Sequence, residues 1–244
     1  MVPVRRVLLV VVLAAAVVGL AVAGVVVFGR DDNGRKVAAS PPPTSTSTTT
    51  TVPLDPTGTL REGMTGPQVT SLQGKLLALG YWVDRVDGVY AHATAHAVTA
   101  FQKSVSLPAT GVADPTTLAR LVAATRPAPR SATGRVIEVD LKRQLLLVTR
   151  DGRVEAVLDA STGTKPGSTP TGQFQVTSES DRDDPGPGGS LHRPKYFSQG
   201  VAIAGSDNVP PTPASQGSVR VTIEAMDWIW ANGVIPIGTP VWVY

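Results

Sequence analysis

The chain has 244 residues, of which 42% are hydrophobic and 17% charged, a composition that fits one or two globular domains. It contains no cysteine, which excludes disulfides, thiolate metal sites, a thiol nucleophile and a lipid-anchored cysteine. The formal net charge is +3, but residues 59–244 carry 17 Lys and Arg against 16 Asp and Glu, so the charge pattern does not indicate a nucleic-acid partner.

Residues 1–28 form an N-terminal apolar segment, with an uninterrupted run from Val7 to Phe28. As a helix these 22 residues would span about 33 Å, enough for a bilayer core of about 30 Å. We predict a single-pass membrane anchor. The alternative is a signal peptide cleaved after Ala23, giving a secreted protein, although the apolar run continues beyond that point. Both interpretations place the folded domains outside the cytoplasm.

Residues 29–58 are predicted to be a linker. The stretch from Ser40 to Gly58 is rich in Pro, Thr and Ser and cannot build a core, so we expect a disordered spacer. In a polyproline-II conformation its 19 residues would reach about 60 Å, which suits a tether that holds domains away from a membrane.

Residues 59–124 show helical spacing of apolar side chains in three stretches. The first runs from Val69 to Leu79 and ends at a glycine, and the second from Thr94 to Phe101. The third begins at Asp114-Pro115, a helix cap followed by a first-turn proline. The pattern predicts a small three-helix domain.

Two histidines of this domain, His92 and His96, have the i, i+4 spacing of some zinc sites. Those sites have a glutamate after the first histidine and a third ligand, whereas residue 93 is alanine and no further ligand is evident. We therefore interpret the histidines as a surface or helix-start pair and predict no metal and no cofactor.

Several short motifs of residues 59–124 follow one another in a characteristic order: Leu60–Gly63, Gly66–Val69, Leu72-Gln73, Leu79–Tyr81, Asp87–Tyr90, Ala97-Val98, Phe101-Gln102 and Gly111-Val112. This order resembles the peptidoglycan-binding domain found at the ends of bacterial cell-wall enzymes. The resemblance implies contact with glycan or stem peptide. Tyr81 and Tyr90 are candidate contacts, together with Gln73 and Trp82, and a core role is the competing interpretation of each.

Residues 125–134 are predicted to be a short linker, after which the apolar period changes to two. The pattern predicts a mostly-β domain over residues 135–244 with one clear helix, from Met226 to Ala231. The expected strands cover residues 136–141, 144–149, 154–158, 174–177, 200–204 and 240–244.

This domain also carries an ordered set of motifs: Ser161–Gly163, Thr169–Phe174, His192–Phe197, Ala202–Gly205, Pro213–Arg220, Met226–Trp230 and Ile237–Val241. The set resembles the catalytic domain of L,D-transpeptidases. In that family a cysteine thiolate attacks the carbonyl before the terminal D-Ala of a tetrapeptide stem, and the acyl-enzyme passes the stem to an amine of a second stem. The resemblance implies an upstream Ile-His-Gly motif and a downstream Ser-His-Gly-Cys-Val-Arg motif.

The sequence departs from both motifs at the chemically active positions. Ala204 and Gln216 stand where the resemblance implies histidines, and Ser218 stands where it implies the nucleophilic cysteine. The neighbours Gly205, Ser215, Gly217 and Arg220 are retained and are our candidate substrate-binding residues. Backbone N–H groups near residues 216–218 are a candidate oxyanion pocket.

Ser218 is a poor replacement for a cysteine nucleophile. A free thiol with a pKa of about 8.5 is a few per cent ionised at pH 7, whereas a hydroxyl with a pKa near 15.7 needs about 12 kcal/mol of help from a positioned base. His192 and Lys195 are the conceivable bases, and the motif order gives no reason to expect either beside Ser218. The polar loop from Asp181 to Gly189 is a surface loop or a flap over the cleft.

We therefore expect a multidomain fold: an N-terminal transmembrane helix, a small all-α three-helix peptidoglycan-binding domain, and a mostly-β L,D-transpeptidase-like domain. The predicted function is non-catalytic binding of peptidoglycan stem peptides and glycan, as a scaffold or regulator of cross-linking, with cell-wall synthesis enzymes as further partners. The alternatives are a transpeptidase or hydrolase that uses Ser218, and a protein–protein interaction module.

Overall fold

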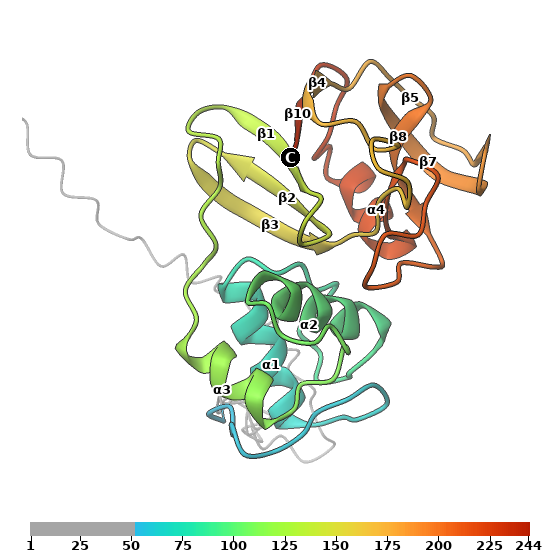
Figure 1. Cartoon of the computed structure of the whole chain (residues 1–244). Coiled ribbons are helices and arrows are strands. Elements are labelled where there is room, and N and C mark those ends of the chain that lie inside the picture. The colour runs from blue at the N-terminus through green and yellow to red at the C-terminus, as the bar shows by residue number, and fades with distance from the viewer. Residues whose placement is uncertain (1–51) are drawn as a thin grey trace, which may run out of the picture. The chain divides into compact units, whose positions relative to one another are not determined.

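The computed structural model describes residues 52–244 (Figure 1). The predicted membrane anchor and most of the predicted linker lie outside these residues. Among the helices of residues 52–244, none is both long and apolar enough to cross a bilayer. The first three helices lie together in Figure 1 and form the helical domain: α1 (Pro67–Ala78), α2 (His92–Ser104) and α3 (Pro115–Ala123).

Local chemistry explains where these helices begin and end. Proline occupies the first turn of α1 and of α3, where its missing N–H costs no helical hydrogen bond. Asp114 caps α3 by accepting a hydrogen bond of 2.7 Å from the Thr117 N–H. Gly80 adopts a φ of 90° after α1, a conformation that favours glycine. The predicted three-helix domain is confirmed.

The remaining chain forms two sheets and one helix, α4 (Ile223–Ala231). The first sheet has the strand order β3-β2-β1-β10-β4, and the second has the order β5-β7-β8-β9 with β6 paired to β7. The strands are β1 (Arg135–Asp140), β2 (Leu145–Arg150), β3 (Arg153–Asp159), β4 (Gly172–Gln175), β5 (Ser178–Glu179), β6 (Asp184–Gly186), β7 (Gly189–Ser198), β8 (Val201–Ser206), β9 (Val219–Thr222) and β10 (Pro240–Val243). The mostly-β expectation is therefore confirmed.

The period-two pattern did not predict β7, which is ten residues long. The alternation of this strand is broken by Pro194 and by shifts of register against β8 between His192 and Lys195 and between Tyr196 and Ser198. Bulges of this kind place successive residues out of phase, so the sequence loses its alternation although the strand persists.

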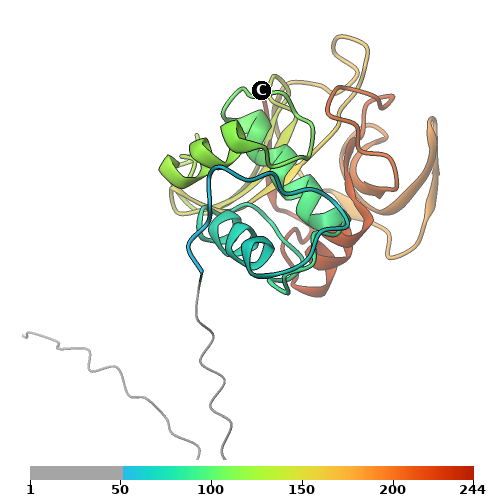
Figure 2. The same cartoon turned by 90° about the horizontal axis from the view of Figure 1, so that it is seen from below.

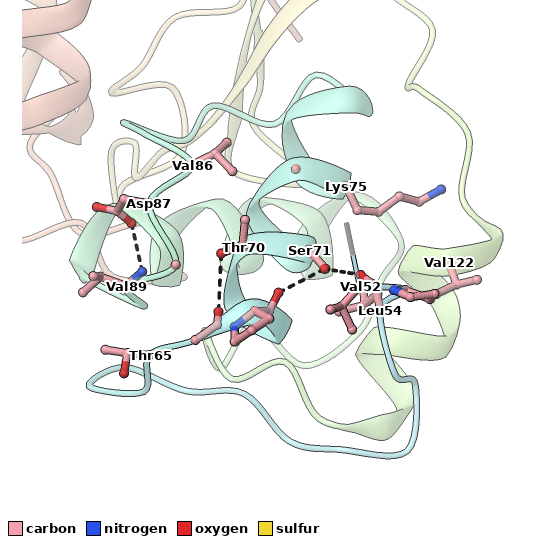
Figure 3. A pocket seen from close by; sticks show the side chains of 15 residues that line it. Val52, Leu54, Thr65, Thr70, Ser71, Lys75, Val86, Asp87, Val89 and Val122 are labelled. Carbon is pink, nitrogen blue, oxygen red and sulfur yellow. Dashed lines mark hydrogen bonds between the residues drawn. The ribbon is translucent and has the colours of Figure 1, made fainter. Parts of the chain in front are cut away.

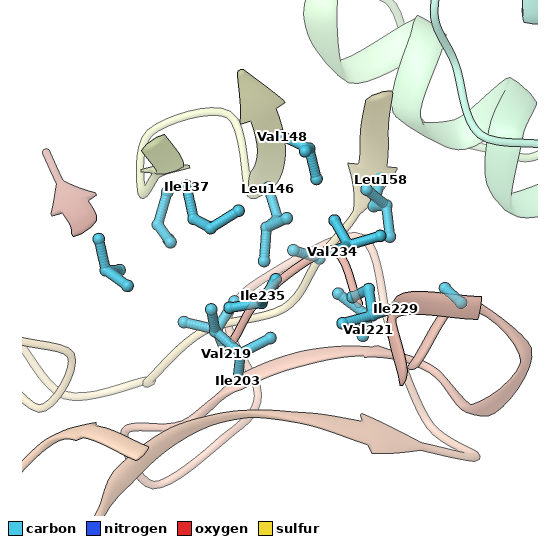
Figure 4. Close-up of a cluster of buried hydrophobic side chains, with 14 of the residues drawn as sticks. Ile137, Leu146, Val148, Leu158, Ile203, Val219, Val221, Ile229, Val234 and Ile235 are labelled. Carbon is cyan, nitrogen blue, oxygen red and sulfur yellow. The ribbon is translucent and has the colours of Figure 1, made fainter. Parts of the chain in front are cut away.

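One apolar core lies between the two sheets and α4, and Figure 4 shows its side chains converging from all three. Ile137 and Leu146 come from the first sheet, Ile203 and Val219 from the second, and Ile229 from α4. All five are nearly inaccessible to solvent. This core holds β8 and β9 in parallel register, which matters because both strands border the cleft described below.

A second apolar core joins the opposite face of the first sheet to the three helices. Leu145 and Leu147 of β2 and Val154 and Val157 of β3 pack in one cluster with α1, α2 and α3. The β2 side chains alternate between the two cores, which explains the unbroken apolar run of this strand. Helix α2 lies against β3, as the labels of Figure 1 show, and Figure 2 shows the same helices from below. The two domains therefore share a core.

Backbone hydrogen bonds reinforce the contact between the domains. The Trp82 N–H donates to the Val157 carbonyl at 2.9 Å, and the Val157 N–H donates to the Gly80 carbonyl at 2.7 Å. The Arg126 guanidinium donates to the Val154 and Ala78 carbonyls at 2.7 and 2.9 Å. Arg126, the second residue of the predicted linker, thus ties β3 to the end of α1.

Candidate functional site

A cleft of about 250 Å³ opens in the β domain beside the ends of β8 and β9. Most of the candidate residues taken from the two degenerate motifs meet here. Those that line the cleft are Gly205, Ser215, Gln216, Gly217, Ser218 and Arg220. Ala204 does not line it: its side chain is fully buried, one residue before Gly205 on β8.

The turn from Ser215 to Ser218 is held by side-chain hydroxyls. Ser215 Oγ donates to the Ser218 carbonyl at 2.6 Å and accepts from the Gly217 N–H at 3.0 Å. Thr169 Oγ1 donates to the Gly217 carbonyl at 2.6 Å. The Gly217 N–H is therefore already used within the turn, which removes one of the three donors expected for an oxyanion pocket.

Two positions of the cleft require glycine because neighbouring atoms lie too close for a Cβ. Gly217 has a φ of +143°, and a Cβ there would lie 2.6 Å from the Ser168 carbonyl oxygen. A Cβ on Gly205 would lie 2.9 Å from Cδ2 of His192. Any side chain at these positions would displace a neighbour, so both glycines shape the cleft wall.

Ser218 is largely buried, and its hydroxyl contacts no side-chain base within residues 52–244. Its Oγ accepts a hydrogen bond of 3.3 Å from the Ala202 N–H of β8. A backbone N–H can only donate, so it can hold the oxygen but cannot remove its proton. The arrangement positions Ser218 as an acceptor and provides nothing that activates it as a nucleophile.

The two conceivable bases are occupied by carboxylates. His192 contacts Asp183 through Nδ1 at 2.8 Å and Asp227 through Nε2 at 2.9 Å. Partial burial lowers the pKa of His192, but the hydrogen bonds and charges of Asp227 and Asp183 outweigh burial and raise that pKa above its usual value. A raised pKa favours the protonated ring, and a protonated imidazole cannot act as a base.

Lys195 is also engaged away from the cleft. Its buried ammonium donates to Glu179 at 2.6 Å and lies 3.6 Å from the centroid of the Trp230 ring. Neither contact leads toward Ser218, and Lys195 is not among the residues that line the cleft.

Arg220 is the cation of the cleft. Its backbone pairs with Ser161 through two hydrogen bonds, N–H to carbonyl at 2.8 Å and carbonyl to N–H at 3.0 Å, which fix the chain at this point. Its side chain lines both the cleft and an adjoining cavity of about 320 Å³. Within residues 52–244 its guanidinium has no ion pair, so it is free to meet an anion.

The loop that was a flap candidate forms a hairpin at the cleft. Strand β6 pairs with the start of β7, and Pro187 and Gly188 at the tip of the hairpin line the cleft. A Cβ on Gly188 would lie 3.5 Å from Nη2 of Arg220. The hairpin therefore brings backbone close to the guanidinium and narrows the space in front of it.

The structure corrects the expectation for Tyr81 and Tyr90. Both rings are buried in the shared core, and burial raises the pKa of each phenol. The Tyr81 hydroxyl lies 2.6 Å from Ser104 Oγ, and the Tyr90 hydroxyl donates to the Gly111 carbonyl at 2.6 Å. The aromatic residues of this domain therefore serve packing, because each phenol end finds a partner inside the protein.

Gln73 and Trp82 are also core residues. Gln73 is buried and donates to the Val89 carbonyl at 3.0 Å while its oxygen accepts from the Gly88 N–H at 2.9 Å. Trp82 packs against Trp228 of α4, with ring centroids 6.0 Å apart. Neither side chain offers a surface to a ligand.

The helical domain has a different feature that residue spacing did not reveal, a broad groove of about 1160 Å³ beside α1 (Figure 3). Its rim carries the exposed apolar side chains Val86, Val89 and Val122. Lys75 and Asp87 add charge of both signs. The rim comes from three separate stretches of chain, which is why no single sequence motif marks it.

Comparison with protein families divides the chain in the same way. Residues 65–121 match the peptidoglycan binding domain family, and residues 134–243 match the L,D-transpeptidase catalytic domain family. A crystal structure of part of an L,D-transpeptidase from Xylanimonas cellulosilytica is 43% identical, with a TM-score of 0.72, and the match covers 76% of this chain and 97% of that one.

Two further matches are more distant or shorter. An L,D-transpeptidase from Stackebrandtia nassauensis is 21% identical with a TM-score of 0.46, over 79% of this chain and 96% of that one. A protein of Bacillus licheniformis named as a probable N-acetylmuramoyl-L-alanine amidase is 39% identical over 67 residues, which is 27% of this chain and only 19% of that protein.

Proposed function

Since the chain belongs to the L,D-transpeptidase catalytic-domain family and carries a peptidoglycan-binding domain before it, we propose that it binds peptidoglycan without cross-linking it. In this role it acts as a scaffold or regulator of cross-linking by other enzymes. Ala204, Gln216 and Ser218 then occupy the positions of two histidines and the cysteine nucleophile.

The environment of Ser218 carries this proposal. Within residues 52–244 the only hydrogen bond of the Ser218 hydroxyl comes from the Ala202 N–H, and His192 and Lys195 are both held by carboxylates. An unassisted hydroxyl would ionise about 7 pKa units less readily than a free thiol. A cleft that has no base beside Ser218 favours binding of a ligand over cleavage of its bonds.

The cleft has the chemistry to hold a stem peptide. The Arg220 guanidinium can form two parallel hydrogen bonds with a carboxylate, which is the terminal group of a peptide stem. The hairpin tip at Pro187 and Gly188 encloses the same space and limits competition from water. Binding through Arg220 requires no change of its existing contacts, because it has no other ion-pair partner in the described chain.

The groove of the helical domain is the second contact that we propose. Val86 and Val122 offer apolar surface and Lys75 and Asp87 offer hydrogen-bonding groups, a combination that suits an amphipathic polymer of sugars and peptides. Because the helices and the first sheet share a core, the two binding sites belong to one folded unit.

We further propose that the N-terminal segment tethers this unit to the membrane outside the cytoplasm, next to the wall.

The direct test is saturable binding of the full chain, purified in detergent, to isolated peptidoglycan and to soluble tetrapeptide muropeptides. Val86→Ser with Val122→Ser should weaken binding to the polymer, and Arg220→Gln should weaken binding to the muropeptide. Leu77→Ser is the matched control, since Leu77 is an exposed apolar residue of α1 outside the groove. The proposal would be contradicted if the chain bound neither peptidoglycan nor the muropeptide.

A further inference from the structure

A pair of histidines at the contact between the domains takes no part in the proposed function. His92 is the first residue of α2 and His96 lies one turn later. Their Nε2 atoms are 3.1 Å apart, and their ring centroids are 4.4 Å apart. Within residues 52–244 there is no cluster of three or more side chains arranged to hold a metal, so any site here rests on two protein ligands.

Each histidine turns its other ring nitrogen toward a carboxylate of the β domain. Nδ1 of His96 lies 2.6 Å from Oδ2 of Asp159, at the end of β3. Nδ1 of His92 lies 3.8 Å from Oε1 of Glu224, in the first turn of α4. The Asp159 contact is at hydrogen-bond distance, so it holds the proton of His96 on Nδ1 and leaves the His96 Nε2 lone pair facing His92, as in metal-binding histidines. Glu224 lies beyond hydrogen-bond distance of His92 and acts on that ring through its charge.

We propose that His92 and His96 form a binding site for a divalent cation that prefers imidazole, Cu²⁺ or Zn²⁺, with water in the remaining positions. A metal at about 2.0–2.1 Å from both Nε2 atoms would subtend roughly 100°, between the square-planar and tetrahedral angles. The His92 side chain is 47% exposed, which leaves room for the water ligands.

The local charges set the strength of this site. The N-terminus of α2 disfavours a cation, while Asp159 and Glu224 favour one. Asp159 already pairs with Lys103, so its charge is partly neutralised. The site is therefore weaker than a structural site with four protein ligands. Because His92 and His96 belong to one domain and both carboxylates to the other, an occupied site stabilises the domain contact by linkage.

The test uses the full chain in detergent, stripped with a chelator and titrated calorimetrically with Cu²⁺ and with Zn²⁺. We expect one equivalent to bind and to raise the melting temperature. His92→Ala should weaken binding at least about tenfold, because one of two protein ligands is lost, and Glu224→Gln should weaken it by up to about tenfold. Circular dichroism establishes that each variant is folded, and His92→Gln is the second variant should the alanine fail to fold.

His192→Ala is the matched control, because His192 is the third and last histidine of the sequence and lies between two aspartates. It should bind metal as the unmodified chain does. The proposal is overturned if the unmodified chain binds neither cation at millimolar concentration, or if His92→Ala binds as tightly as the unmodified chain. Unchanged affinity in Glu224→Gln would overturn the assigned role of that carboxylate.

Discussion

Lys103 of α2 and Asp159 of β3 form a buried ion pair that joins the helical domain to the β domain. The same ammonium donates to the Gln144 carbonyl at 3.2 Å and to the Ala160 carbonyl at 2.9 Å. Both charged side chains are almost completely buried, so each depends on the other for compensation. The pair therefore makes the relative placement of the two domains specific.

Replacing Lys103 with methionine should destabilise the protein by about 3–5 kcal/mol, because Asp159 would keep a buried charge with His96 as its one remaining ion-pair partner among residues 52–244. Urea denaturation of the full chain in detergent measures the change. Lys142→Met is the control, since Lys142 is exposed and forms none of these contacts, and it should be neutral within about 0.5 kcal/mol. Equal stability of the two variants would contradict the role given to Lys103.

The stability contributed by His192 should depend on pH. Its folded-state pKa is raised, so the contribution is fully present below the unfolded value of about 6.5 and is lost as the pH rises through the folded value. The difference in unfolding free energy between the unmodified chain and His192→Gln should shrink as the pH rises from 6 upward.

Denaturation curves of both proteins at a series of pH values measure this difference, and contributions that the two proteins share cancel in the comparison. A difference that is constant, or that grows with pH, would show that Asp183 and Asp227 do not hold the protonated ring.

Gly217→Ala should destabilise the protein by about 1–3 kcal/mol, because the new Cβ meets the Ser168 carbonyl at 2.6 Å in a backbone conformation that L side chains rarely adopt. Gly189→Ala separates the effect of the steric clash from that of the unfavourable backbone conformation. Gly189 has a φ of +116°, but no described atom lies within 4 Å of the position of an added Cβ. Thermal unfolding of both variants should show the larger loss for Gly217, and a larger loss for Gly189 would exclude the clash as the dominant effect.

Restoring sulfur to the cleft should restore reactivity. Ser218→Cys combined with Gln216→His replaces a hydroxyl by a thiol that is a few per cent ionised at pH 7 and adds an imidazole beside it. Intact-protein mass spectrometry after exposure to a carbapenem should show an adduct on this double variant and none on the unmodified chain. Ser218→Cys alone should react more slowly, and an adduct on the unmodified protein would contradict our account of Ser218.

Sequence patterns predicted the elements whose chemistry is local. The Asp114-Pro115 start of α3, the glycine after α1 and the alternating strands β1 and β3 are all set by neighbouring residues. Strand β7 was missed because Pro194 and two changes of register interrupt its alternation.

The errors at the sites have a different cause. Tyr81 and Tyr90 were expected to be ligand contacts, but whether an aromatic side chain is exposed depends on which residues pack over it in the folded chain. Both rings lie in the cluster that the helices form with β2 and β3, and the Tyr90 hydroxyl donates to the Gly111 carbonyl of its own domain. The carboxylates behind His92 and His96 come from residues more than 60 positions away, so spacing along α2 could not reveal them. Tertiary packing decided these cases.

Whether the protein binds peptidoglycan without cross-linking it is tested by incubating the full chain with tetrapeptide muropeptides, followed by mass spectrometry of both protein and products. We expect the muropeptide to be retained, Ser218 to carry no covalent adduct, and release of D-Ala to be no greater than in Ser218→Ala. An acyl adduct on Ser218, or D-Ala release that Ser218→Ala abolishes while remaining folded, would contradict this expectation.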